Sequence, residues 1–254
     1  MAAAGERTCG SLDSHPYARS APLDCRNRRV LVIRAKKKGE PDEVNAGERW
    51  GCLVQDRLSR FIAACTTGRI GDDLVERAVT LTVSRTQGRA LRWGSDGWRG
   101  YAAILKRAYR RPVRSGKPGR PQLRVPADVR LTQTIKHRDE HGKLLSVEIR
   151  AVLGEIISEP GTVHIERVNG TLRDRLNALT RKTHAFAKRD AMWDALVGLQ
   201  IFDHNFHRTH QALRLPFEEG VRRYRQQSPA MALGLTNHLW SFQELLTSRV
   251  PTTP

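Results

Sequence analysis

The stretch RWGCLVQDRLSRFIAACTTG, residues 49–68, contains two short apolar runs on either side of a turn-like segment. The runs RWGCLVQ (49–55) and RFIAACTTG (60–68) have the length and composition of β-strands, and DRLS between them suits a tight connection. The stretch therefore predicts a β-hairpin at the start of an ordered domain.

The segments that follow this hairpin alternate between helix and strand patterns. Residues 72–86 are amphipathic and begin with two aspartates, which favours a helix N-terminus. Residues 89–109 predict a strand that ends near Ser95, a glycine-flanked turn and a helix. A second hairpin is predicted over 127–150, turning near DEHGK, and helices over most of 163–205. This order predicts an α/β fold with a mixed sheet flanked by helices and a helical C-terminal part.

The composition favours a polyanionic partner. The chain has 254 residues, 44 lysines and arginines against 26 aspartates and glutamates, and a formal net charge of +18. Such an excess is typical of nucleic-acid-binding proteins, and the low aromatic content argues against a base-stacking single-strand binder. A basic RNA-binding structural protein is a less favoured alternative. The sequence has no apolar run long enough to span a membrane, which predicts a cytoplasmic protein without a membrane partner.

The cysteines have no paired metal-binding spacing. We therefore expect reduced thiols of a cytosolic protein and no zinc site. The four cysteines are Cys9, Cys25, Cys52 and Cys65.

The segment VHIERVNGTLRDRLNALTRKT, residues 163–183, has apolar residues at helical spacing. Glu166, Asn169, Gly170 and Arg173 are three, four and seven positions apart, so they share a different helical stripe. One interpretation is a solvated helix face with a local ion pair. The other is a functional face that carries a carboxylate, an amide and a guanidinium.

Asp96 lies in WGSDGW, where a predicted strand ends. Ligands of open α/β sheets collect beyond the carboxyl ends of strands, although an ordinary turn aspartate is the simpler reading of SDG. Together with Glu166, Asp96 would supply the hard oxygen ligands that a pair of Mg²⁺ (or Mn²⁺) ions requires. Nearby arginines would neutralise phosphates rather than read bases.

Five separated blocks in the same order resemble DDE transposases of bacterial insertion sequences, the IS-one-like group. The blocks are GERWGCLVQDRLSRFIAACTTG, SDGWRGY, HIERVNGTLRDRLNALTRKTHAFAK, HNFHRTHQALR and PAMALGLTNHLWSFQEL. The resemblance covers about four-fifths of the chain. It implies a ribonuclease H-like fold, a two-magnesium site and cleavage and joining of DNA strands at insertion-sequence ends. It also implies a nucleoid-associated protein that forms a homo-oligomer when active.

The resemblance assigns roles to single residues. It implies that Asp96 and Glu166 are catalytic and bind metal, and that Asn169 orients the glutamate or the DNA backbone. Basic and polar residues expected to contact DNA are Arg167, Asn169, Arg173, Arg175, Lys182, Arg208 and His210. The organisation it suggests is a disordered or out-of-frame segment 1–35, a catalytic domain 36–215 and a C-terminal helical tail 216–254.

Two further groups of residues have alternative readings. His204, His207 and His210 are three positions apart, but steps of three drift around a helix, so we do not expect them to converge on a metal. Asp56 follows a predicted strand, and we interpret it as a turn residue, with a catalytic role as the alternative.

The first aspartate of the family pattern is missing. Residues 28–34 read RRVLVIR, where the family has a block resembling DEFWSFV. Codon degeneracy allows RRVLVIR to be written with codons that, read one base later, spell Asp-Glu-Phe-Trp-Ser-Phe-Val. The hypothesis is therefore a frameshift near 34–36, with a diverged strand as the alternative. Either way the expected activity is impaired, and a catalytically inactive DNA-binding remnant is the alternative function.

Overall fold

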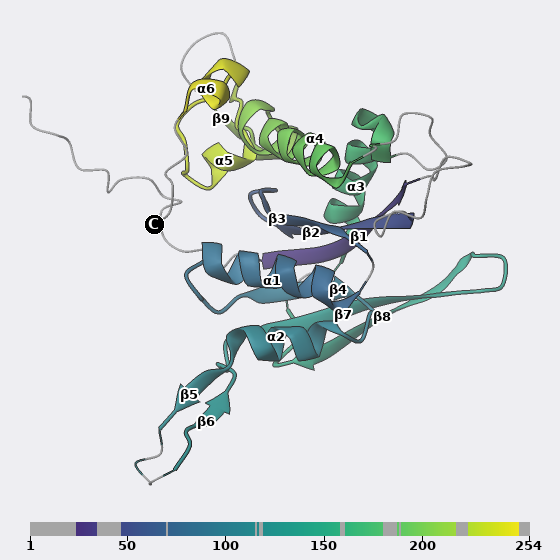
Figure 1. Cartoon of the computed structure of the whole chain (residues 1–254), viewed down its shortest axis with the longest axis vertical. Helices are drawn as coiled ribbons and strands as arrows, with labels where there is room; N and C mark the ends of the chain where they lie inside the picture. The colour runs from purple at the N-terminus through teal and green to yellow at the C-terminus, as the bar shows by residue number, and fades with distance from the viewer. Residues whose placement is uncertain are drawn as a thin grey trace, which may run out of the picture.

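The structure is a computed structural model that describes residues 24–34, 47–69, 71–114, 116, 119–157, 161–179, 187, 189–216 and 223–248. Within these ranges it describes side chains from Trp50 onward, except that of Asp72. A mixed β-sheet lies between two layers of helices, which confirms the predicted α/β class (Figure 1).

The sheet has six strands in the order β3-β2-β1-β4-β7-β8. Strands β1, β2 and β3 are antiparallel neighbours, β4 and β7 run parallel to β1, and β8 returns antiparallel to β7. The bounds are β1 (Asp24–Arg34), β2 (Gly47–Asp56), β3 (Ile62–Gly68), β4 (Arg92–Asp96), β7 (Arg130–Arg138) and β8 (Leu144–Leu153).

Both predicted hairpins are confirmed. The first is β2–β3, where the amide of Asp56 donates to the carbonyl of Phe61 at 2.8 Å. The second is β7–β8, which turns at residues 139–143 as expected and extends away from the body of the molecule (Figure 1). The Pro/Gly/Arg-rich segment before β7 contains a small hairpin of β5 (Arg111–Val113) and β6 (Gln122–Arg124).

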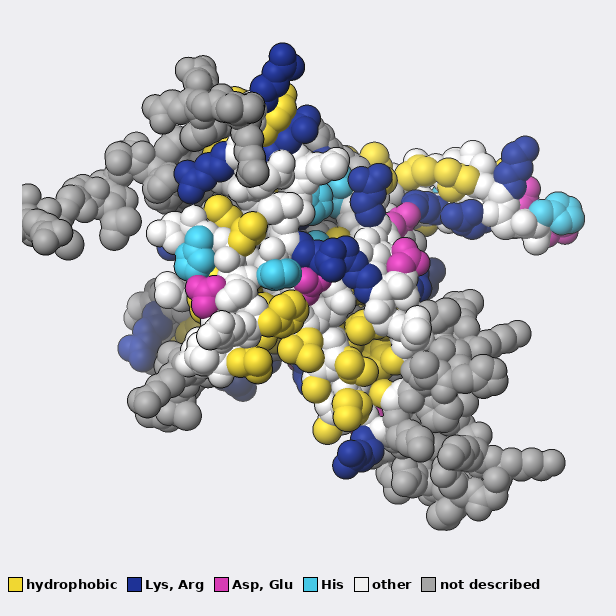
Figure 2. Space-filling model, turned by 90° about the horizontal axis from the view of Figure 1, so that it is seen from above, with side chains coloured by type: hydrophobic (Ala, Val, Ile, Leu, Met, Phe, Trp, Pro, Cys, Tyr) yellow, Lys and Arg dark blue, Asp and Glu magenta, His cyan; other side chains and the backbone are white. Residues whose placement is uncertain are grey.

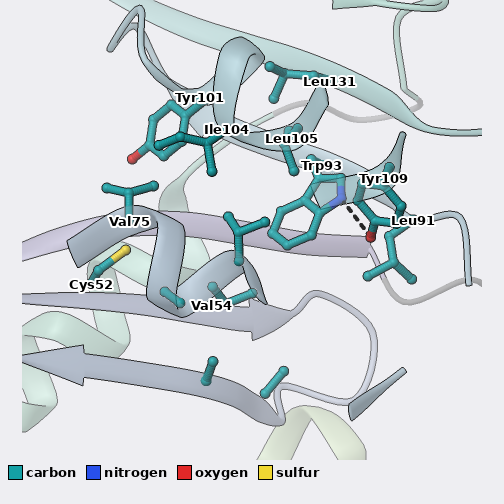
Figure 3. Packing of buried hydrophobic residues seen from close by; sticks show 14 of the residues in the cluster. Cys52, Val54, Val75, Leu91, Trp93, Tyr101, Ile104, Leu105, Tyr109 and Leu131 are labelled. Atoms are coloured by element: carbon teal, nitrogen blue, oxygen red, sulfur yellow. Dashed lines mark hydrogen bonds between the residues drawn. The ribbon is translucent and has the colours of Figure 1, made fainter. Parts of the chain in front are cut away.

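Helices α1 (Asp72–Arg85) and α2 (Tyr101–Tyr109) cover one face of the sheet. The core on this face contains Trp93 of β4, whose indole Nε1 donates a hydrogen bond to the Tyr109 hydroxyl at 3.3 Å (Figure 3). Cys52 and Val54 of β2 also point into this core, as alternate residues of a strand do.

Helices α3 (Val163–Arg175) and α4 (Asp190–Phe202) cover the opposite face, which we call the α3 face. Leu53 of β2 packs here against Ile165, Val168 and Trp193. Since Leu53 lies between two residues of the other core, its position shows how strand alternation divides side chains between the two faces.

The C-terminal part is a set of short elements packed near α4 (Figure 1). A ring cluster joins them to α4 and includes a stacked pair, Phe202 and Phe206, and an edge contact between Phe202 and Trp240. A short 3-10 helix, η1 (Asn177–Leu179), lies between α3 and α4 in the chain. The elements that follow α4 are a π-helical turn η2 (Asp203–His207), η3 (Gln211–Leu213), β9 (Leu215–Pro216), β10 (Tyr224–Arg225), α5 (Pro229–Ala232) and α6 (Phe242–Thr247).

The expected disorder of residues 1–35 does not hold for Asp24–Arg34. These residues form β1, which pairs with both β2 and β4 inside the sheet. Backbone pairing on both edges outweighs the irregular composition of the segment, and the run VLVI has the β-branched and apolar character of a strand. Residues 1–23 lie outside the described part of the chain. Among described residues, no helix has the length and apolar character needed to cross a membrane.

Candidate active site on the α3 face

Asp96 is the last residue of β4, and strand alternation assigns it to the α3 face. Trp93 points into the core under α1 and α2, so Ser95 shares that face and Asp96 the opposite one. The Asp96 carboxylate accepts a hydrogen bond from the Trp98 amide at 3.3 Å, as in a short aspartate turn. Gln133 supports this turn because its amide nitrogen donates to the carbonyls of Asp96 and Trp98 at 3.0 and 2.8 Å.

Glu166 lies in the first turn of α3 and faces the sheet. Its Oε1 accepts from the Lys136 ammonium at 2.6 Å and from the Thr162 hydroxyl at 2.6 Å. The two partners of this ion pair are each partly exposed, with side-chain exposures of 28% for Lys136 and 30% for Glu166. The cation lies on a strand and the anion on a helix, so the pair fixes α3 against the sheet.

Asp96 and Glu166 therefore share one face of the sheet. Thr134 of β7 is the backbone partner of Asp96, and Lys136 lies two residues further along that strand on the same face. A two-residue step is about 7 Å. Since Lys136 reaches Glu166 directly, the two carboxylates approach the same region from neighbouring elements.

The register of β1 places position 28 beside Asp96. Asn27 pairs with Ser95 in the parallel ladder, so the next residue on each strand is Arg28 and Asp96. On the other side, Arg28 is the backbone partner of Leu53, which belongs to the α3 face. Two independent registers thus assign position 28 to the face that carries Asp96 and Glu166.

The remaining residues expected to contact DNA separate into distinct environments. Arg167 is exposed and Arg173 and His210 are half-buried, whereas Asn169 is buried with neither amide atom hydrogen-bonded. Asn169 is therefore part of the packing under α3 rather than a surface contact. Lys182 lies outside the described residues.

Arg175 and Arg208, both expected to contact DNA, form ion pairs within the protein. Both guanidinium groups donate to Oδ2 of Asp203, Arg175 at 3.0 Å, and the Asp203 side chain is only 10% exposed. Gln200 adds a third donor to the same oxygen at 3.1 Å. Sequence reasoning missed this network because Arg175 lies 28 positions before the Asp203 carboxylate.

The histidines of DHNFHRTH point to different partners. His204 donates through Nε2 to the Arg60 carbonyl at 2.9 Å, and His207 donates through Nδ1 to the Trp240 carbonyl at 2.7 Å. Burial lowers the pKa of His204 below its ordinary value, and the hydrogen bond to the Arg60 carbonyl partly opposes this shift. His204 and His210 still approach one another, with ring centroids 6.4 Å apart.

Asp56 is buried and completes the β2–β3 turn. Its Oδ2 accepts from the amide of Ser59 at 2.8 Å and from the Ser59 hydroxyl at 2.6 Å. The structure thus gives Asp56 the turn position that the sequence predicted for it.

The donor set on the α3 face does not fit a pair of Mg²⁺ ions. Two such ions need several carboxylates, including one that bridges them, and among described residues this region offers Asp96 and Glu166. Glu166 is already neutralised by Lys136, and position 28 carries an arginine. No family model and no curated protein matches this sequence.

Proposed function

We propose that this chain is a DNA-binding protein of the DDE transposase type, with a ribonuclease H-like fold whose metal site lacks its first carboxylate. The strand arrangement supports the fold: three antiparallel strands, then two parallel to the first, with α1 and α2 as the crossover connections. The five sequence blocks and the net charge of +18 support DNA as the partner.

The main support for this proposal is that position 28, Asp96 and Glu166 lie on the same face of the sheet. The shifted reading that codon degeneracy allows for residues 28–34 begins with aspartate, and that aspartate would fall at position 28. The register of β1 brings this position next to Asp96. The place where the sequence lacks an acid is therefore the place where the fold would use one.

The consequence is a protein that binds DNA weakly and non-specifically and cleaves DNA strands little. The reaction of the family is hydrolysis of a phosphodiester at an element end, followed by attack of the freed 3′-hydroxyl on target DNA. Position 28 does not supply the carboxylate that divalent cations need, and Lys136 competes for Glu166.

The test is nicking of supercoiled plasmid DNA in Mg²⁺ or Mn²⁺ by the full chain and three variants. Arg28→Asp supplies the carboxylate, whereas Arg28→Asn removes the positive charge without adding one. We expect nicking by Arg28→Asp alone, and its loss in the double variant Arg28→Asp/Glu166→Gln.

Two results would contradict the proposal. Equal nicking by wild type and Arg28→Asp would mean that position 28 is not part of the site. No nicking by Arg28→Asp, with DNA binding retained, would favour the second candidate, an inactive DNA-binding remnant that acts at most by mixed assembly with an intact transposase.

A further inference from the structure

The β2–β3 turn and the C-terminal motif DHNFHRTH meet at a positively charged cluster. It consists of Arg60, Arg167 and His210, which we call the Arg60 cluster. Nε and Nη1 of Arg60 are shielded from solvent and have no hydrogen-bond partner, and the same is true of Nδ1 of His210. In Figure 2, basic side chains adjoin histidines near the middle of the face seen from above.

The members of the Arg60 cluster influence one another electrostatically. Burial lowers the pKa of Arg60, and the positive charges of Arg57 and Arg167 lower it further, against a smaller opposite effect of the Asp56 carboxylate. Burial also lowers the pKa of His210, with Arg60 and Arg167 as additional causes. Cationic groups that are desolvated and adjacent are unfavourable unless an anion compensates them.

The backbone of Arg60 is held in a conformation that arginine seldom adopts. Its φ is 63°, in the left-handed region. Its carbonyl accepts from Gln55 at 2.9 Å and from His204, so side chains from two distant segments fix the turn. Backbone strain that the surroundings maintain in this way is concentrated at ligand clamps and active sites.

A neighbouring contact ties the same two segments together. The side chain of Asn205 accepts from the amide of Ile62 at 2.8 Å and donates to the carbonyl of Ile62 at 3.0 Å. Asn205 lies in the π-helical turn η2, a distortion that frequently marks functional sites. The position of Arg60 relative to His210 is therefore built into the fold.

We propose that the Arg60 cluster binds a phosphate group, and that this phosphate belongs to the backbone of DNA. A phosphate offers several acceptor oxygens and a negative charge to the unpaired donors of Arg60 and His210. Arg167 directly follows Glu166 in α3, so the bound backbone would lie beside the candidate active site. The choice of DNA as the source rests on the proposed function.

The test uses Arg60→Asn, because asparagine tolerates the left-handed backbone and lacks the guanidinium group and its positive charge. Arg110→Gln is the matched control, since Arg110 is exposed at the end of α2 on the opposite face. Arg167→Gln is a second test variant whose exposed side chain can be changed without disturbing the core.

Two measurements distinguish the source of the phosphate. The first is the thermal midpoint in inorganic phosphate against sodium chloride of equal ionic strength. The second is the affinity for duplex DNA by fluorescence anisotropy at several salt concentrations. We expect phosphate to raise the midpoint of wild type and Arg110→Gln but not of Arg60→Asn. Duplex affinity should fall by about tenfold in Arg60→Asn, with a salt slope smaller by roughly one.

Unchanged duplex affinity and salt slope in both Arg60→Asn and Arg167→Gln would overturn the proposal. Loss of the phosphate effect without loss of DNA affinity would also overturn it, because the cluster would then bind a free anion. Neither result bears on nicking by Arg28→Asp, so failure here is distinguishable from failure of the proposed function.

Discussion

The side chain of Asn205 makes the most specific contact between the C-terminal motif and the sheet. It is 2% exposed and satisfies both backbone groups of Ile62, which lies 143 positions earlier and is itself buried. In Asn205→Leu, leucine keeps the branching at Cγ but leaves the amide and the carbonyl of Ile62 without their side-chain partner. Each buried backbone group left unsatisfied costs about 1–3 kcal/mol.

The expected loss in the free energy of unfolding is therefore about 2–6 kcal/mol, or a fall in thermal midpoint of roughly 4–24 °C. Urea denaturation followed by tryptophan fluorescence measures it. The matched control is Asn177→Leu, because Asn177 is exposed in η1. If Asn205→Leu unfolds at the same urea concentration as wild type, the reasoning is refuted, since the contact would then be replaceable by water.

Three further predictions concern buried or partly buried ionisable groups. Asp203→Asn should lower the free energy of unfolding by about 1–3 kcal/mol in urea titrations, because Arg175 and Arg208 lose their shared carboxylate; an unchanged midpoint would contradict this. The pKa values of His204 and His210 are lowered in the folded protein. Their contribution to stability is therefore complete above about pH 6.5, the pKa of an unfolded histidine, and is lost as the pH falls toward their pKa values in the folded protein. We expect thermal midpoints to decrease from pH 7.5 to 5.5. That decrease should be smaller in His204→Gln, and an equal decrease would argue against His204 as a source. Burial raises the pKa of the Cys65 thiol to about 12, so iodoacetamide at pH 8 should label Cys65 in urea but not in the folded protein, as read by peptide mass spectrometry; rapid labelling of folded protein would contradict the burial.

Local patterns predicted the hairpins and helices because the responsible contacts are close in sequence. The apolar runs on either side of DRLS and the turn DEHGK each specify their own pairing. The strand β1 was predicted only as the alternative to a frameshift, since its partners, β2 and β4, are distant from it in the chain and its own composition is rich in arginine. Pairing with a neighbouring strand on each side depends on the tertiary structure and cannot be predicted from the composition of the strand itself.

The site was predictable to the extent that it depends on helical and strand periodicity. Spacing placed Glu166 on one stripe of α3, but the stripe residue Asn169 is buried instead of exposed. The partner of Glu166 is Lys136, 30 positions earlier, and no local pattern couples them. Arg60 had no sequence signal, because its unpaired donors and its left-handed backbone arise only when the turn meets DHNFHRTH.

The central claim is that position 28, Asp96 and Glu166 converge on one incomplete metal site. Titration with Mn²⁺, followed by the electron paramagnetic resonance signal of the free ion, tests it without any requirement for catalysis. We predict weak binding by the chain as it stands, tighter binding by Arg28→Asp, and reversal in Arg28→Asp/Glu166→Gln. Equal Mn²⁺ binding by all three proteins would contradict the account.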